Sequence, residues 1–211
     1  MALLTAAQAR LYLPGITGTG EDTTLDTLIA RVGAAIAEYL GYPPASAGAS
    51  RTVESATYTL YSGRRELIEI AEEGRRLCLP VAPITAVTSI YDDPNEEYGS
   101  ETLVSSSDYT ICGEWNNEIR LKALSTHGAF SDPDDAPRAV RAIVVAGYSS
   151  IPEELKHAAG LAVAHNYARR AAGGGTQIDA AGVRLSFQSA ILPDPVLEIL
   201  APLRPAYGWA A

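Results

Sequence analysis

Residues 139–158 read AVRAIVVAGYSSIPEELKHA, and the pattern of secondary structure changes within this stretch. Its first half, 139–148, is an almost continuous apolar run, which predicts a strand that is buried on both faces. Ile151-Pro152-Glu153-Glu154 then begins a helix, because Pro is tolerated in the first helical turn and acidic side chains are stabilised by the helix dipole there. The stretch therefore predicts a chain that mixes strands and helices.

The helix that follows is expected over 152–172. It is rich in alanine, so neighbouring elements can approach it closely, and Arg169 and Arg170 suit the negative C-terminal end of the dipole. This is the longest element expected in the second half of the chain.

Two further helices are predicted at the N-terminus. Thr5 and Gln8 have the spacing of a capping box, which predicts a short helix over 5–13. Apolar residues at steps of three and four predict a second helix over 22–40.

The ends of the second helix also carry signals. Asp22 or Thr23 is expected to cap its N-terminus, and Gly41, followed by two prolines, is expected to stop it.

The region 51–148 has the pattern of strands. Short β-branched or aromatic runs are separated by Gly, Pro, Asp and Asn, which predicts a small antiparallel sheet. Two polar loops, 92–107 and 125–137, interrupt the sheet. Besides 139–148, the expected strands are 57–61, 67–70, 77–79, 86–91, 109–112 and 118–122.

The chain after residue 172 is expected to form an extension. Gly173-Gly174-Gly175 indicates a hinge, 183–188 alternates like a strand, and 194–203 can form a last short helix. Because such a segment has little core of its own, we expect it to pack on something else, with another subunit as one option. The predicted fold class is thus α+β, with a core over 1–172 and a docking tail over 173–211.

Composition and charge exclude several classes of function. The 211 residues contain 16 basic and 25 acidic side chains, a net charge of −9. No cluster of Lys and Arg is longer than a pair, which disfavours tight binding to nucleic acid phosphates, whereas an acidic wall would let DNA pass without sticking.

The sequence also indicates a cytosolic product. Two cysteines, Cys78 and Cys112, are too few for a disulfide scaffold, and we interpret them as small hydrophobic residues. The N-terminus lacks the pattern of a secretory signal, and the longest apolar stretch is shorter than the roughly 20 residues that span a bilayer.

Motifs of catalysis and ligand binding are mostly missing from the sequence. The glycine-rich segment 15–20 has neither a preceding strand nor a following Lys, so it is interpreted as a plain loop. Asp93, Asn95 and Glu97 have the spacing of a calcium loop, but Tyr98 stands where that loop requires Gly, which favours solvated loop acids. We therefore expect no cofactor.

One enzymatic alternative stays open. Glu153 and His157 lie four residues apart on one predicted helix, and His165 follows eight residues later. These three side chains could hold a metal in a small acidic hydrolase or metal enzyme, although zinc sites use three or four good ligands.

The order of the elements resembles a known family of virion proteins. Four stretches carry the likeness, and the ending 192–204 adds to it; the four are Leu3–Leu13, Asp26–Gly41, Leu79–Val87 and Ala146–Ala158. Together they resemble the head–tail connector family of tailed phages, also called gp6-like or adaptor proteins.

The resemblance implies a structural part and not an enzyme. It implies a homo-oligomeric ring of about twelve copies beneath the portal protein, in the virion neck between head and tail, assembled from subunits made in the bacterial host cytoplasm. The ring would extend the channel for double-stranded DNA, without sequence-specific binding, and would dock a stopper or another tail-proximal neck protein. A different ring-forming neck protein, a stopper or a tail terminator, is a second alternative.

The resemblance also assigns roles to three groups of residues. The portal- or partner-docking tail would use Leu192, Pro193, Val196, Leu197, Leu200, Leu203, Arg204, Tyr207 and Trp209. The ring and channel helix would use Glu153, Glu154, Lys156, His157, Ala158, Ala162, His165 and Arg169. Loop contacts to the next neck protein would use Asp92, Asp93, Glu96, Glu97, Asp132, Asp134 and Asp135.

Overall fold

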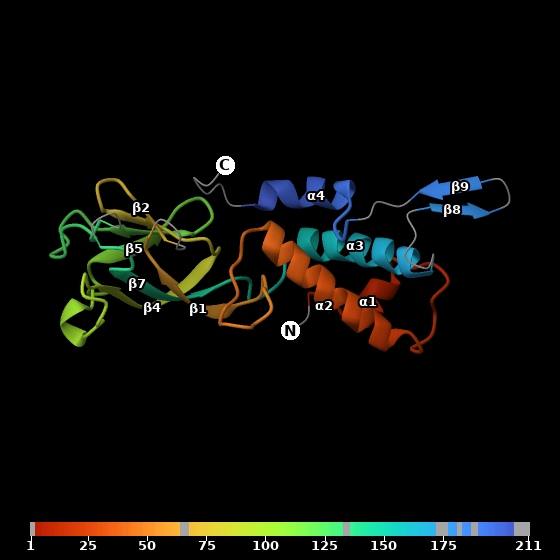
Figure 1. Cartoon of the computed structure of the whole chain (residues 1–211), viewed down its shortest axis with the longest axis horizontal. Coiled ribbons are helices and arrows are strands. Elements are labelled where there is room, and N and C mark those ends of the chain that lie inside the picture. Colours follow the sequence, from red (N-terminus) through yellow and green to blue (C-terminus); the bar gives the residue numbers. More distant parts are fainter. Residues whose placement is uncertain are drawn as a thin grey trace. The chain divides into compact units, whose positions relative to one another are not determined.

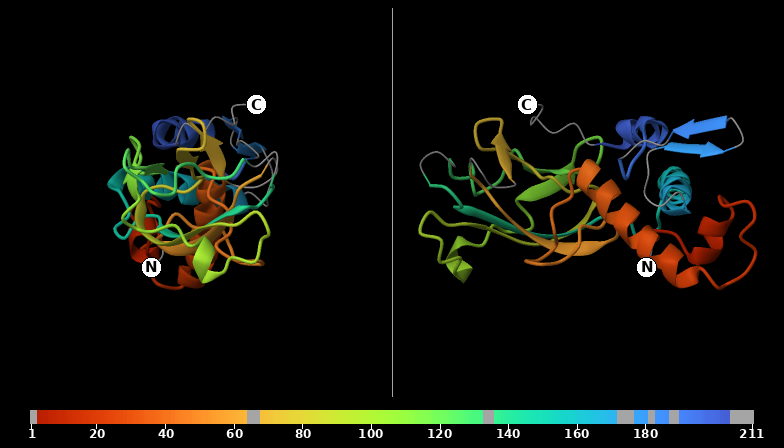
Figure 2. Two further views of the ribbon diagram at one scale, coloured as in Figure 1. Left: turned by 90° about the vertical axis from the view of Figure 1, so that its left-hand side faces the viewer. Right: turned by 45° about the vertical axis from the view of Figure 1, so that its right-hand side comes forward.

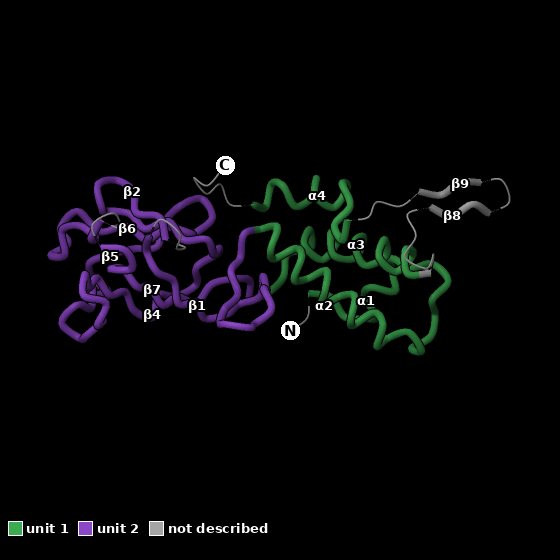
Figure 3. The backbone as a smooth tube through the Cα atoms, viewed as in Figure 1, with its two compact units in different colours: residues 1–40, 150–204 green, residues 41–149, 205–211 purple. Residues whose placement is uncertain are grey.

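The computed structural model has helices and antiparallel sheets in two compact units (Figures 1 and 3). It describes residues 3–63, 68–132, 136–171, 177–180, 183–186 and 190–204. Unit 1 combines 1–40 with 150–204, and the described residues of unit 2 lie within 41–149. The α+β class is as expected, whereas the unit boundaries differ from the division at residue 172.

Unit 1 is helical. Its elements are α1 (Ala6–Arg10), α2 (Asp22–Tyr39), α3 (Glu153–Ala171), α4 (Asp194–Leu200) and the 3₁₀ turn η2 (Ala201–Leu203), with a hairpin of β8 (Gln177–Ala180) and β9 (Val183–Ser186). Helix α3 contacts α1, α2 and α4, so it is central to the unit (Figure 2). None of the helices among the described residues is both long and apolar enough to cross a membrane.

The N-terminal signals are confirmed in part. The capping box of α1 is present, with Thr5 Oγ1 accepting from Gln8 N–H at 3.2 Å. The expected cap of α2 is wrong: Glu21 is its N-cap, and Asp22 instead accepts from Arg10 Nη1 at 2.9 Å. Gly41 ends α2 with a φ of 88°, the left-handed conformation that glycine adopts without strain.

Helix α4 belongs to the core of unit 1. Val196 and Leu200 are fully buried, and Leu155 on α3 is buried as well. The segment packs on something outside itself, as expected, and for these side chains that neighbour is α3 of the same chain.

Unit 2 contains two antiparallel sheets. The first has the order β1-β7-β4 and the second β2-β3-β6-β5, so the single sheet expected from sequence is divided in two. The strands are β1 (Ala56–Tyr61), β2 (Glu69–Ala71), β3 (Arg76–Cys78), β4 (Ile84–Asp92), β5 (Tyr109–Cys112), β6 (Glu118–Leu121) and β7 (Val140–Ala146), with a 3₁₀ turn η1 (Ser100–Thr102).

The central strand β7 corrects one expectation. Its residues alternate between buried and half-buried, so only one face is fully buried. Arg141, Ile143 and Val145 lie on the other face and remain partly accessible. The continuous apolar run arises because β7 is paired on both edges, with β1 and β4.

Backbone segments pack closely at the end of the first sheet. Gly147 N–H donates to Pro83 O at 2.9 Å, next to the cis peptide bond between Ala82 and Pro83. Gly147 has a φ of 102°, and a Cβ atom there would lie 2.4 Å from Glu54 O. Only glycine fits this position.

Candidate interaction surfaces

Helix α3 carries the first predicted group of site residues. Glu153, Glu154 and His157 are exposed, and Lys156 Nζ lies 2.6 Å from Glu153 Oε1. Ala158 and Ala162, the other small side chains of this group, are buried inside unit 1. They let the neighbouring helices of the same chain approach closely, so they are not available for contact between copies.

His157 has a partner within unit 1. Its Nδ1 atom lies 3.2 Å from the Tyr12 hydroxyl, and the two ring centroids are 5.7 Å apart. One turn further along α3, a Cβ atom added to Gly160 would lie 2.3 Å from Tyr12 Cε2. The Tyr12 ring therefore packs directly on α3.

The metal-binding alternative gains no support from these positions. Glu153 is paired with Lys156 and His157 with Tyr12, while His165 is half-buried further along α3. Across the described ranges, no group of three His, Cys, Asp or Glu side chains is placed to hold a metal ion.

The predicted docking tail is mostly buried or half-buried. Leu192, Pro193, Val196 and Leu200 are buried, and Leu197 and Leu203 are half-buried. Arg204 is exposed, with its guanidinium carbon 5.7 Å from the centre of the Tyr39 ring. Tyr207 and Trp209 lie outside the described residues.

Asp92, from the predicted loop-contact group, faces inward. Its side chain is only 5% exposed and accepts from His127 Nε2 at 2.8 Å and from Ser131 N–H at 3.0 Å. Burial raises the pKa of Asp92, but these hydrogen bonds outweigh burial and leave the pKa below its usual value. No role could be predicted for His127 from its local sequence, because its partner Asp92 is 35 residues away.

Asp93 is also buried, at 3% exposure, and organises the loop that follows it. Its two carboxylate oxygens accept from Asn95 N–H at 2.9 Å and from Tyr98 N–H at 2.6 Å. The expectation of solvated acids is therefore wrong for Asp93, and it holds for Glu96 and Glu97, which are exposed.

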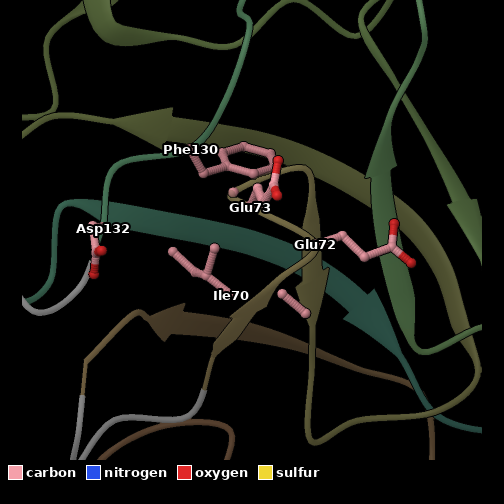
Figure 4. A pocket seen from close by; sticks show the side chains of 7 residues that line it. Ile70, Glu72, Glu73, Phe130 and Asp132 are labelled. Carbon is pink, nitrogen blue, oxygen red and sulfur yellow. The ribbon is translucent and has the colours of Figure 1, made fainter.

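Asp132, also from the predicted loop-contact group, lies at an open hollow in unit 2. Asp132 is exposed and lines this hollow of about 550 Å³ together with Ile70, Glu72, Glu73 and Phe130. Figure 4 shows the Glu72 side chain extending away from the side where Asp132 lies, and Glu72 is paired with Arg120 and Arg76. The carboxylates do not converge on a common point. Asp134 and Asp135 lie outside the described residues.

Both cysteines lie beside one glutamate. Glu118 on β6 is the register partner of Cys78 on β3 and of Cys112 on β5, so the two free, half-buried thiols are separated by a strand. Burial raises the pKa of Cys78 to about 11 and also raises that of Cys112. A raised pKa predicts slow reaction of both thiols, which are less buried than expected.

A cluster of tyrosines and arginines, which sequence reasoning missed, lies on the first sheet. Arg141 on β7 is the register partner of Tyr61 on β1 and Tyr91 on β4, and its guanidinium carbon lies 4.4 Å from the Tyr91 ring centre and 4.1 Å from that of Tyr98. Arg138 stacks on Tyr61 at 4.2 Å. We call these five residues the tyrosine–arginine cluster. The abundance of Tyr, 11 residues, was its only signal in the sequence.

A second missed feature is a pocket in unit 1 that is lined by arginines. Leu28 and Arg31 of α2, with Asn166, Arg169 and Arg170 of α3, surround a volume of about 190 Å³. We call it the arginine pocket. Its residues come from segments more than 130 positions apart, so no local pattern predicts it.

Comparisons with known proteins add no relatives to this description. No family model matches the chain, and no curated protein sequence matches it. Its function has to be argued from its own residues.

Proposed function

We propose that the protein is a structural head–tail connector of a tailed phage or phage-like particle. Subunits would form a homo-oligomeric ring of about twelve copies under the portal, extend the DNA channel and present a docking face to the next neck protein. This proposal relies on the α1–α2 pair, the long helix α3 and the C-terminal segment with α4.

The observation that carries the proposal is that the stretches of the resemblance meet one another in space. Asp26–Gly41 lies largely in α2, which packs on α3, the helix that begins within Ala146–Ala158. Leu79–Val87 meets this last stretch at the bond between Gly147 N–H and Pro83 O. Residues that form joints of the fold are a firmer basis for a resemblance than residues scattered on the surface.

The accessible side chains support a role in assembly. The tyrosine–arginine cluster combines aromatic rings and guanidinium groups, the side chains that most often anchor protein interfaces. In the loop after Asp93, the exposed Glu96 and Glu97 project from a backbone that Asp93 holds in place, which suits repeated contact with a partner.

Electron microscopy of the purified protein, with and without its portal, tests the proposal. We expect rings, either alone or on the portal, and we expect arginine substitutions in the tyrosine–arginine cluster to weaken attachment without unfolding unit 2. A protein that stays monomeric with the portal and joins no portal-bearing head would overturn the proposal.

A truncation provides a second arm of this test. It has to end after Arg204, because removing 173–211 would also remove α4 from the core of unit 1 and confuse misfolding with lost docking. We expect the shorter protein to stay folded and to attach less well to the portal, if residues after Arg204 dock there.

A further inference from the structure

The arginine pocket brings three guanidinium groups to one place on an acidic protein. Asn166, Arg169 and Arg170 are spaced by three and four residues, so they lie on one face of α3 near its C-terminus. Leu28 and Arg31 are three residues apart, so they also lie on one face of α2. The pocket therefore has an apolar wall, provided by the buried Leu28, and a rim rich in charged donors.

One carboxylate of the same chain already pairs with an arginine of the pocket. Arg170 Nη1 lies 3.2 Å from Glu21 Oε2, and both side chains are about half exposed. Arg31 is exposed as well. A neighbouring carboxylate makes the pocket less suited to a doubly charged phosphate than to another carboxylate, since like charges repel at this distance.

Charge is divided unequally between the two units. Residues 1–40 and 150–204 contain seven basic and nine acidic side chains, a net charge of −2, whereas residues 41–149 contain nine and sixteen, a net charge of −7. Contact between the same units of two copies would be opposed by repulsion. Contact between unit 1 of one copy and unit 2 of another is electrostatically favoured where the arginine pocket meets exposed acids.

A pre-organised acidic segment is present in unit 2. Glu96, Glu97 and Glu101 are all exposed within six residues. Asp93 bonds the backbone of this loop, and the Tyr98 hydroxyl donates to Arg138 O at 2.7 Å. We call Glu96–Glu101 the acidic loop; its ordering reduces the entropy lost on binding.

We infer that the arginine pocket of one copy binds carboxylates of the acidic loop of a second copy. A contact between two different surfaces can repeat head-to-tail from copy to copy, and such a series closes into a ring when the rotation permits. The inference deepens the proposed function and rests on it for the ring, while the contact itself can be measured without a portal.

Charge reversal tests the contact. In the full-length protein, Arg31→Glu with Arg170→Glu reverses the pocket, and Glu97→Lys with Glu101→Lys reverses the loop. Sedimentation velocity at low ionic strength should show concentration-dependent association of the wild type, weakened about tenfold or more in each reversed protein. About 0.5 M salt should weaken the wild-type association too.

The combined variant and matched controls separate this contact from misfolding. A protein with all four changes should regain association, because its pocket and loop are again complementary. Asp26→Lys in unit 1 and Glu114→Lys in unit 2 reverse exposed charges elsewhere and should associate like the wild type. Circular dichroism should show the same folded spectrum for every protein.

Three results would overturn the inference. They are a wild type with no concentration-dependent association at low ionic strength, reversed proteins that associate like the wild type, and a combined variant that stays as weak as the single reversals. Loss of binding to inorganic phosphate or duplex DNA in the pocket variant, with unchanged self-association, would assign the pocket to another anion. Rings that form on the portal in spite of both reversals would support the proposed function without this contact. Association between free copies that never bind a portal would support the contact without the proposed function.

Discussion

The two units bury different kinds of groups at their decisive positions. In unit 1 the decisive contacts join side chains to helices, as where the Tyr12 ring packs on Gly160 and Leu200 is buried in the core near α3. In unit 2 the decisive contacts involve backbone atoms: Gly147 lies against the backbone of Glu54, and the Asp93 side chain accepts from the Tyr98 backbone N–H. Side chains can change rotamer, whereas backbone atoms of a paired sheet cannot, so unit 2 should tolerate less change at its joints.

The largest expected effect is at Gly147. Gly147→Ala places a Cβ 2.4 Å from Glu54 O and a non-glycine residue at a φ of 102°. Strain and overpacking together should lower the free energy of unfolding by about 3 kcal/mol or more. Urea denaturation followed by circular dichroism measures this change.

Gly160→Ala is the matched change in unit 1. Its Cβ meets the Tyr12 ring, a half-buried side chain that can move by giving up its contact with His157, and alanine favours a helix over glycine by about 1 kcal/mol. We expect a loss below about 1.5 kcal/mol. Equal losses in the two variants would break the contrast between the units.

Leu200→Ala should have the next largest effect. Leu200 is fully buried, so its truncation leaves a cavity in unit 1 and should cost about 2–4 kcal/mol. Thermal unfolding detects a loss of this size. Leu203→Ala, at a half-buried position just beyond, is the control and should cost less; an unchanged Leu200→Ala protein would show that α4 does not contribute to the core.

Asp92 gives unit 2 a dependence on pH. Because the folded pKa of Asp92 is depressed, its contribution to stability is present above the unfolded pKa of about 3.9 and is lost as pH falls through the folded value. Asp92→Asn should be less stable near neutral pH, by about 1–3 kcal/mol, and its stability should fall less steeply between about pH 5 and pH 3.

Denaturation midpoints measured across that pH range compare the variant with the wild type. Glu97→Gln, at an exposed acid five residues further on, is the control and should follow the wild-type curve. Parallel curves for Asp92→Asn and the wild type would contradict the role given to the bond with His127.

The cysteines should give the smallest effect. With its pKa raised to about 11 by burial, Cys78 is about one-thousandth thiolate at pH 8, so Ellman's reagent should react with it roughly a hundredfold more slowly than with free cysteine. The rate should rise with pH, and both thiols should react rapidly in guanidinium chloride. Fast reaction of the native protein would show that unit 2 opens at β3.

The helices could be predicted from sequence because their signals are local. The capping box of Thr5 and Gln8, the stop at Gly41 and the short helix after Pro193 each depend on residues within a few positions. The strands were also found at their expected places, apart from β8, which follows a glycine-rich segment that indicated only a hinge.

What could not be predicted depends on residues far apart in the sequence. Tertiary packing decides what covers a helix face, so the sequence did not reveal that α3 of the same chain packs on α4, where Val196 and Leu200 are buried. The partners of Asp92 lie 35 and 39 residues away, and the arginine pocket joins residues of α2 and α3. Spacing rules carry no information at such separations.

The division of unit 1 between the two ends of the chain has a consequence during synthesis. Helices α1 and α2 leave the ribosome first, and α3 follows only after roughly 110 further residues, about 5–20 s later at ordinary rates of translation. Unit 2 is continuous and can fold in that interval. For the same time α3 is not there to pack on the apolar face of α2, which includes Leu25, Val32 and Ile36. This makes the nascent chain a substrate for chaperones until α3 is made.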